Sequence, residues 1–239
     1  MRIEAKRFFN SKFYLIVLGI CMLSYILGYF LLVTIDHTQV NSIMLLFEST
    51  YTVFTQFGML IFSPLIIYQF SSDYKEKNVI FYKSAGFSAL SYYLCKIATL
   101  ILSFTFSIII VSFLVCCLFR DFSIFHIMFL YFEAVIICYI IEIGIWAFLF
   151  KNFVISFFVN FMTWIMLIVL SSFGGIMSFA SYYDASSPLY DNLTRYLDNK
   201  PCIDVISYFG KSIIYDICVF ILSIIIIIIF SRKWEENGV

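Results

Sequence analysis

Six long runs of apolar residues, separated by shorter polar segments, dominate the pattern of this chain. Each run is long enough to cross the hydrocarbon core of a bilayer as a helix, which takes about 20 residues. The predicted spans are residues 13–34, 51–70, 97–119, 124–150, 153–179 and 213–230. Backbone groups in lipid must find their hydrogen-bond partners within the chain. We therefore predict an all-α polytopic membrane protein with a single transmembrane domain over residues 1–239.

Composition supports the same class. Hydrophobic residues make up 63% of the chain and charged residues 13%, whereas soluble domains average roughly 45–50% and 25%. The net charge of zero gives no reason to expect a nucleic-acid partner. The first run, Phe13–Val33, is too long for a secretory signal and is not followed by a small-residue cleavage site. We expect it to remain in the bilayer as the first span.

Lysine and arginine lie mainly on one side of the predicted spans. Eleven lie on the side of the N-terminus and four on the other. The first group is Arg2, Lys6, Arg7, Lys12, Lys75, Lys77, Lys83, Lys96, Lys151, Arg232 and Lys233, and the second is Arg120, Arg195, Lys200 and Lys211. By the positive-inside rule, both termini are predicted to be cytoplasmic.

The stretch Asp73–Lys96, between spans two and three, is the longest polar-containing segment on the predicted cytoplasmic side. Acidic residues favour a helix N-terminus, where Asp73 and Glu76 lie, and glycine favours the end of a helix, where Gly86 lies. The pattern predicts a helix of about a dozen residues, Tyr74–Ala85. A short cytosolic helix in a membrane protein suits the binding of a soluble partner.

Two aromatic residues of this helix, Phe81 and Tyr82, are predicted to protrude as anchors for that partner. Buried aromatic side chains supply much of the affinity of protein interfaces. The alternative is an interfacial helix that lies on the membrane and binds no protein.

Two further segments have open interpretations. Residues 1–12 carry four basic side chains beside Ile3, Phe8 and Phe9, which is typical of an interfacial helix or of a plain basic flank. Residues 180–212 are rich in tyrosine, which is typical of a membrane–water boundary. They would form either a cap of short re-entrant or interfacial helices over the outer mouth of a pathway or an ordinary external loop.

Span four contains two carboxylates, Glu133 and Glu142. A carboxylate near the bilayer centre costs about 2.5–3.5 kcal/mol on insertion scales, so such groups usually face protein or water. Nine residues of helix turn the second side chain roughly 180° from the first and move it about 13–14 Å along the axis. The two carboxylates are therefore predicted not to form a dyad. Packing, a conduction pathway and chemistry remain their alternative roles.

The chain lacks the sequence motifs of several enzyme classes. It has no HExxH or GxSxG pattern, and no GxxxxGK[ST] loop with which to bind ATP. Its seven cysteines form no CxxC pair or metal spacing, so we expect unpaired apolar cysteines and no metal. An intramembrane enzyme is disfavoured.

The layout resembles that of the permease subunits of type-2 ABC exporters. In that family an N-terminal elbow helix precedes six spans, and a cytoplasmic coupling helix joins spans two and three. It starts near an acidic residue, ends in a small-residue turn and leads to a lysine at the foot of span three. The matching features here are Asp73, the turn Ser84–Ser88 and Lys96. Lys77-Asn78 replaces the Gly-Thr that is frequent in the family.

The resemblance implies a coupling helix within residues 73–88. Its coupling residues would be Asp73, Lys77, Phe81, Tyr82 and Gly86. It also implies cytosolic ATPase subunits that carry ATP and Mg²⁺, and a second permease in a homodimer or heterodimer. In composition the chain is most similar to bacteriocin- or lantibiotic-immunity and peptide-export permeases. The expected function is export of an amphipathic or hydrophobic peptide, and the alternative is an ion-coupled transporter or channel that uses Glu133 or Glu142.

Overall fold

The computed structural model describes residues 12–173, 181–184, 187–197 and 205–232, which are helical apart from short connections. The helices are α2 (Phe13–Thr34), α3 (Ile43–Lys75), α4 (Asn78–Ser84), α5 (Ala89–Phe119), α6 (Phe125–Leu149), α7 (Phe153–Ser172), α8 (Pro188–Leu197) and α9 (Val205–Ile229). The described part contains no strand. Six of the helices, all but α4 and α8, can cross a membrane by length and composition. The all-α fold predicted from the sequence is confirmed.

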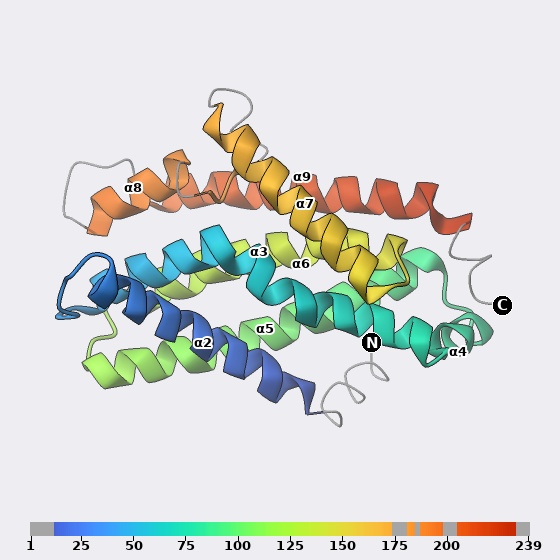
Figure 1. Ribbon diagram of the computed structural model, residues 1–239, viewed down its shortest axis with the longest axis horizontal. Coiled ribbons are helices and arrows are strands. Elements are labelled where there is room, and N and C mark those ends of the chain that lie inside the picture. The colour runs from blue at the N-terminus through green and yellow to red at the C-terminus, as the bar shows by residue number, and fades with distance from the viewer. Residues whose placement is uncertain (1–11, 174–180, 185–186, 198–204, 233–239) are drawn as a thin grey trace.

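Helix α6 forms the centre of the bundle and is buried on nearly all sides. It contacts α3, α5, α7 and α9, while α2 packs against α3 and α5. Helices α7 and α9 lie at the periphery and bury little of their surface within the chain. The short helices lie at opposite ends of the bundle (Figure 1), and the end of α9 lies toward the same end as α4. We call these the α4 end and the α8 end.

Helix boundaries differ from the predicted spans where polar residues lie inside a helix. Helix α3 begins at Ile43 instead of residue 51 and continues to Lys75 instead of residue 70. Helices α5 and α9 each begin eight residues before the predicted span, at Ala89 and Val205. Hydropathy measures how much of a helix suits the hydrocarbon core, whereas a helix can continue into polar surroundings. The predicted helix of residues 1–12 lies outside the described residues apart from Lys12.

Pro64 lies within α3, and the helix continues through it. Proline has no N–H, so the carbonyl of Leu60, one turn earlier, loses its usual helical partner. The Ser63 hydroxyl donates to that carbonyl at 3.2 Å. Such local replacement allows a proline to remain in a transmembrane helix.

Helices α2 and α3 approach closely where Gly28 faces Thr50. A Cβ atom on Gly28 would lie 2.8 Å from the Thr50 Cα, closer than packed atoms allow. The Ser49 hydroxyl donates to the Gly28 carbonyl at 2.8 Å, and Tyr25 of α2 hydrogen-bonds Ser112 of α5 at 2.9 Å. Small residues and interhelical hydrogen bonds are the usual means of joining helices in lipid.

The tyrosine-rich segment folds back onto the bundle at the α8 end. The Tyr190 hydroxyl lies 2.5 Å from the Thr52 hydroxyl, and its ring stacks on Tyr51 of α3. Leu189 and Leu193 give α8 a buried apolar face. The described parts of residues 180–212 are thus packed against the spans, which favours the cap over the ordinary loop.

Orientation in the membrane is testable at one exposed residue of each end. In a cysteine-free background, Ala85→Cys should react with a membrane-impermeant maleimide only in inside-out vesicles. Arg195→Cys should react only in intact cells, because the charge distribution predicts that the α4 end is cytoplasmic. Both side chains are exposed, and the Arg195–Asp191 pair is a surface ion pair of small energetic value. Labelling of both residues from the same side would contradict the six-span topology.

Candidate functional site

The connection between α3 and α5 is the candidate coupling site, and α4 is shorter than predicted. Lys77 adopts a left-handed conformation with φ 58°, which separates α3 from α4. Tyr74 therefore belongs to α3, and the predicted helix Tyr74–Ala85 is corrected to α4, Asn78–Ser84. The left-handed conformation costs a residue with a side chain roughly 1–2 kcal/mol. It is a conformation that glycine adopts freely, and Lys77-Asn78 stands where the resembling family often has Gly-Thr.

Gly86 terminates α4 as predicted. It has φ 80°, and its N–H donates to the carbonyl of Lys83 at 2.9 Å. The next N–H, of Phe87, donates to the carbonyl of Tyr82 at 3.0 Å. These two bonds form a Schellman motif, which satisfies the last carbonyls of the helix and reverses the chain toward α5.

Phe81 and Tyr82 have opposite environments. Phe81 is 55% exposed, whereas Tyr82 is 4% exposed and packs against Phe87 and Tyr92. The prediction that both protrude is wrong for Tyr82, because successive residues of a helix point about 100° apart. Ile80, at 46% exposure, is the apolar neighbour that faces outward with Phe81.

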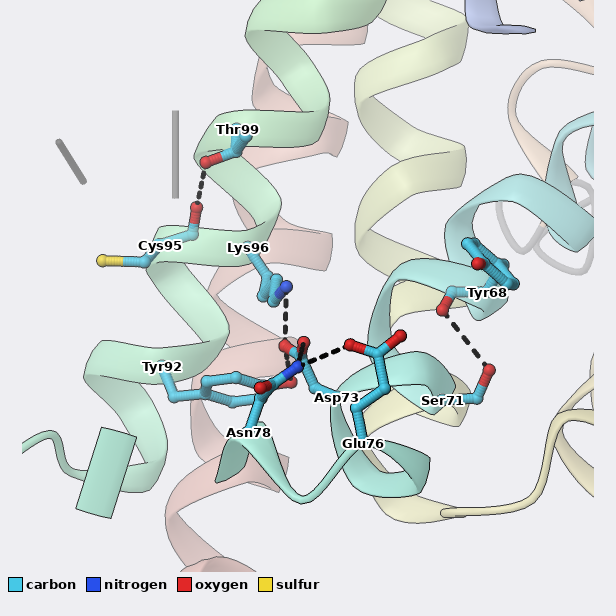
Figure 2. Close-up of polar contacts among 9 residues, drawn as sticks. All are labelled: Tyr68, Ser71, Asp73, Glu76, Asn78, Tyr92, Cys95, Lys96 and Thr99. Atoms are coloured by element: carbon cyan, nitrogen blue, oxygen red, sulfur yellow. Dashed lines mark hydrogen bonds and ion pairs between the residues drawn. The ribbon is translucent and has the colours of Figure 1, made fainter. Parts of the chain in front are cut away.

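Asp73 is at the centre of a buried polar cluster (Figure 2). Its Oδ2 lies 2.6 Å from Lys96 Nζ and accepts a hydrogen bond from the Tyr92 hydroxyl at 3.0 Å. Both charged side chains are almost fully buried. Asn78 Nδ2 donates to Glu76 Oε2 at 2.8 Å and to Asp73 Oδ1 at 3.5 Å. We call Asp73, Lys96, Tyr92 and Asn78 the Asp73 cluster.

The Asp73 cluster joins three elements. Asp73 lies in the last turn of α3, Asn78 is the first residue of α4, and Tyr92 and Lys96 lie on one face of α5. Asp73 was predicted to begin the coupling helix, but it instead ends α3 and holds the foot of α5. The cluster therefore connects α4 to two membrane-spanning helices, α3 and α5.

A hollow of about 650 Å³ lies beside the same end, between the end of α3 and the turn from α6 to α7. It is lined by Tyr68, Ser71, Ser72, Lys75, Glu76, Lys151, Asn152 and Phe153. The surface of the α4 end therefore combines the exposed apolar side chains of α4 with a hollow lined mainly by polar and charged residues.

The two carboxylates of α6 lie in different surroundings, in agreement with their helical spacing. Glu133 accepts a hydrogen bond from Thr105 of α5 and lines a groove between α6 and α9. Glu142 lines a small cavity of about 30 Å³ on the side of α3 and α7, which is large enough to hold a water molecule. The structure does not bring them together as a dyad.

A third intramembrane carboxylate, Asp216 of α9, was not singled out from the sequence. Its Oδ1 accepts a hydrogen bond from the buried Tyr183 hydroxyl at 2.9 Å. Asp184, next to that tyrosine, accepts from Gln56 of α3 at 3.4 Å. An acidic residue within an otherwise apolar run was the available signal, but its pairing with a residue 33 positions away required the fold.

Comparisons with known proteins agree with the resemblance found in the sequence. The model of the peptide export permease protein YydJ family matches residues 1–239. The chain is 30% identical over 244 residues to a Bacillus subtilis (strain 168) protein named "Probable peptide export permease protein YydJ", and the match covers 100% of both chains. No solved structure matches the chain.

Proposed function

Since this chain belongs to the peptide export permease protein YydJ family, we propose that it is the transmembrane subunit of an ATP-driven ABC exporter. The chain is a multi-pass protein of the cytoplasmic membrane. Its partners would be cytosolic ATPase subunits that bind ATP and Mg²⁺, and a second permease, either a copy of itself or a related chain. The substrate would be an amphipathic or hydrophobic peptide such as a bacteriocin, exported for secretion or for immunity.

The observation that carries this proposal is the connection of α4 to the spans through the Asp73 cluster. The α4 helix presents Ile80 and Phe81 to solvent, while Asp73 and Lys96 hold its base against α3 and α5. A chain without a nucleotide-binding loop must receive mechanical work from a partner if it pumps. Closure of the ATPases would push on α4, and the buried ion pair would transmit the movement to α3 and α5.

Three intramembrane carboxylates, Glu133, Glu142 and Asp216, favour one second candidate, an ion-coupled transporter. Membrane carboxylates commonly form proton relays. Glu133 and Asp216 line one groove, whereas Glu142 lines a separate cavity that also contains Tyr183, the hydrogen-bond donor to Asp216.

Energy source separates the two candidates. The assay uses inside-out membrane vesicles from cells that express the chain with its ATPase, in which export appears as uptake of radiolabelled peptide. Vanadate should abolish this uptake, because vanadate traps ABC ATPases. The uptake should persist when a protonophore collapses the proton gradient while ATP is supplied. The reverse result, protonophore-sensitive and vanadate-resistant transport, would replace the ABC proposal with the ion-coupled one.

A further inference from the structure

A groove on the flank of the bundle is separate from the Asp73 cluster and combines apolar walls with two acids. It has a volume of about 350 Å³ and lies between α6 and α9, with one residue from α5. It is lined by Ile101, Leu130, Glu133, Ala134, Ile137, Ile141, Phe209, Ile213, Asp216, Ile217 and Phe220. We call this surface the acidic groove.

One acid of the groove, Glu133, has a carboxylate oxygen without a hydrogen-bond donor among the described residues. Glu133 Oε1 accepts from Thr105, but Oε2 is buried and has no hydrogen-bond partner among the described residues. Asp216 accepts from Tyr183 at 2.9 Å. None of the lining residues is basic. A buried carboxylate oxygen without a donor is costly, so the groove favours an occupant that brings a positive charge.

Depth in the bundle restricts what that occupant can be. Glu133 lies about 12 Å along α6 from its first residue, and Asp216 lies about 10 Å along α9 from Phe209, where the membrane-spanning part of that helix begins. An amine of a lipid headgroup sits at the membrane surface, more than a helical turn away from either acid. A lysine or arginine of a peptide can reach this depth while its neighbours contact the apolar walls.

A second copy of the chain fits the groove poorly. In a twofold dimer whose axis passes through this surface, each acidic groove would meet another acidic groove. Like charges in an apolar contact repel each other, and the wall residues supply no cation to separate them. Charge complementarity therefore favours a peptide.

We propose that the acidic groove binds a cationic, apolar segment of the exported peptide, with one lysine or arginine held between Glu133 and Asp216. Isoleucine and phenylalanine side chains of α6 and α9 would contact the apolar residues beside that cation. This proposal rests on the proposed function in peptide export and specifies its substrate class, a peptide in which basic residues alternate with large apolar ones.

Binding can be tested with the full chain in lipid nanodiscs and a fluorescent helical peptide of leucine and lysine. A control peptide carries glutamate in place of each lysine. Anisotropy should show binding of the lysine peptide only, and Glu133→Gln and Asp216→Asn should each weaken it at least tenfold, as for loss of a charge-assisted hydrogen bond. Glu142→Gln is the matched comparison in the same helix and should weaken binding less than twofold, because it faces another cavity.

Several outcomes would overturn the proposal. Equal losses from Glu133→Gln and Glu142→Gln would show a general charge effect. Dependence of binding on phosphatidylethanolamine in the nanodisc, with no dependence on peptide charge, would assign the groove to lipid. A change of oligomeric state in the Glu133→Gln variant would assign it to a subunit interface. Vanadate-sensitive export with undiminished peptide binding by both groove variants would reject the groove while retaining the exporter. Absence of any vanadate-sensitive export would instead reject the proposed function.

Discussion

Removing one partner of the buried Asp73–Lys96 pair is expected to destabilise the folded chain by about 3–5 kcal/mol, because the other charge is left buried without its counter-ion. Asp73→Asn leaves the Lys96 ammonium, and Lys96→Met leaves the Asp73 carboxylate, at a site where both side chains are at most 3% exposed. Asp73→Asn also weakens the bond from Tyr92, which donates to the lost carboxylate oxygen. Thermal unfolding of the purified chain in detergent, followed by size-exclusion chromatography, measures the loss.

Two controls identify the cause of that loss. Asp191→Asn removes one member of the exposed Asp191–Arg195 pair, which is 3.1 Å apart and more than half exposed, and should cost less than about 1 kcal/mol. The double variant Asp73→Asn with Lys96→Met removes both buried charges and should recover much of the stability lost by either single variant. Single variants no less stable than Asp191→Asn would contradict the structural role of the pair.

The ratio of peptide export to ATP hydrolysis distinguishes a role of the Asp73–Lys96 pair in transmitting force from a role in stability alone. The double variant lacks the ion pair that links α3 to α5, so it should fold and bind its ATPase yet export less peptide per ATP hydrolysed. An unchanged ratio of export to hydrolysis would limit the Asp73 cluster to a structural role.

The sequence predicted the spans well where apolar runs end at polar residues, and poorly where helices continue past them. Helix α2 spans the predicted residues 13–34, and α6 differs from its predicted span by one residue at each end. Glu48 and Asp73 lie in apparent loops of the hydropathy pattern but belong to α3. Glu48 lies in the part of α3 before the predicted span, and Asp73 forms an ion pair with Lys96. The polarity of the residues near Asp73 in the sequence cannot reveal that its charge is balanced by a residue of another helix.

The sequence located the short helix between α3 and α5 and its terminating glycine, but not the contacts of this connection. The end of α4 at Gly86 could be predicted because it depends on the backbone conformation of that residue, φ 80°, and not on contact with a distant residue. The burial of Tyr82 depends on Phe87 and Tyr92, and a helix of seven residues is too short for a pattern to show which face is covered. Asp216 was missed for a similar reason, since its tyrosine partner lies in the preceding segment and only the fold brings the two together.

Truncation of the exposed face of α4 is expected to release the ATPase while leaving the spans folded. Ile80→Ala with Phe81→Ala removes two side chains that are 46% and 55% exposed. Loss of one buried aromatic anchor from an interface often costs about 2 kcal/mol, which corresponds to roughly a thirtyfold weaker association. Co-purification of the ATPase with the tagged chain should fall accordingly, and hydrolysis should no longer drive peptide export.

Matched variants separate docking from folding. Phe122→Ala removes an exposed phenylalanine, at 48% exposure, from the connection at the α8 end and should leave ATPase binding unchanged. Tyr82→Ala removes a side chain that is packed between Phe87 and Tyr92, so it should lower the unfolding temperature as well as coupling. If the double variant Ile80→Ala with Phe81→Ala keeps both its ATPase and its export, α4 is an interfacial helix that lies on the membrane and does not transmit the work of ATP hydrolysis.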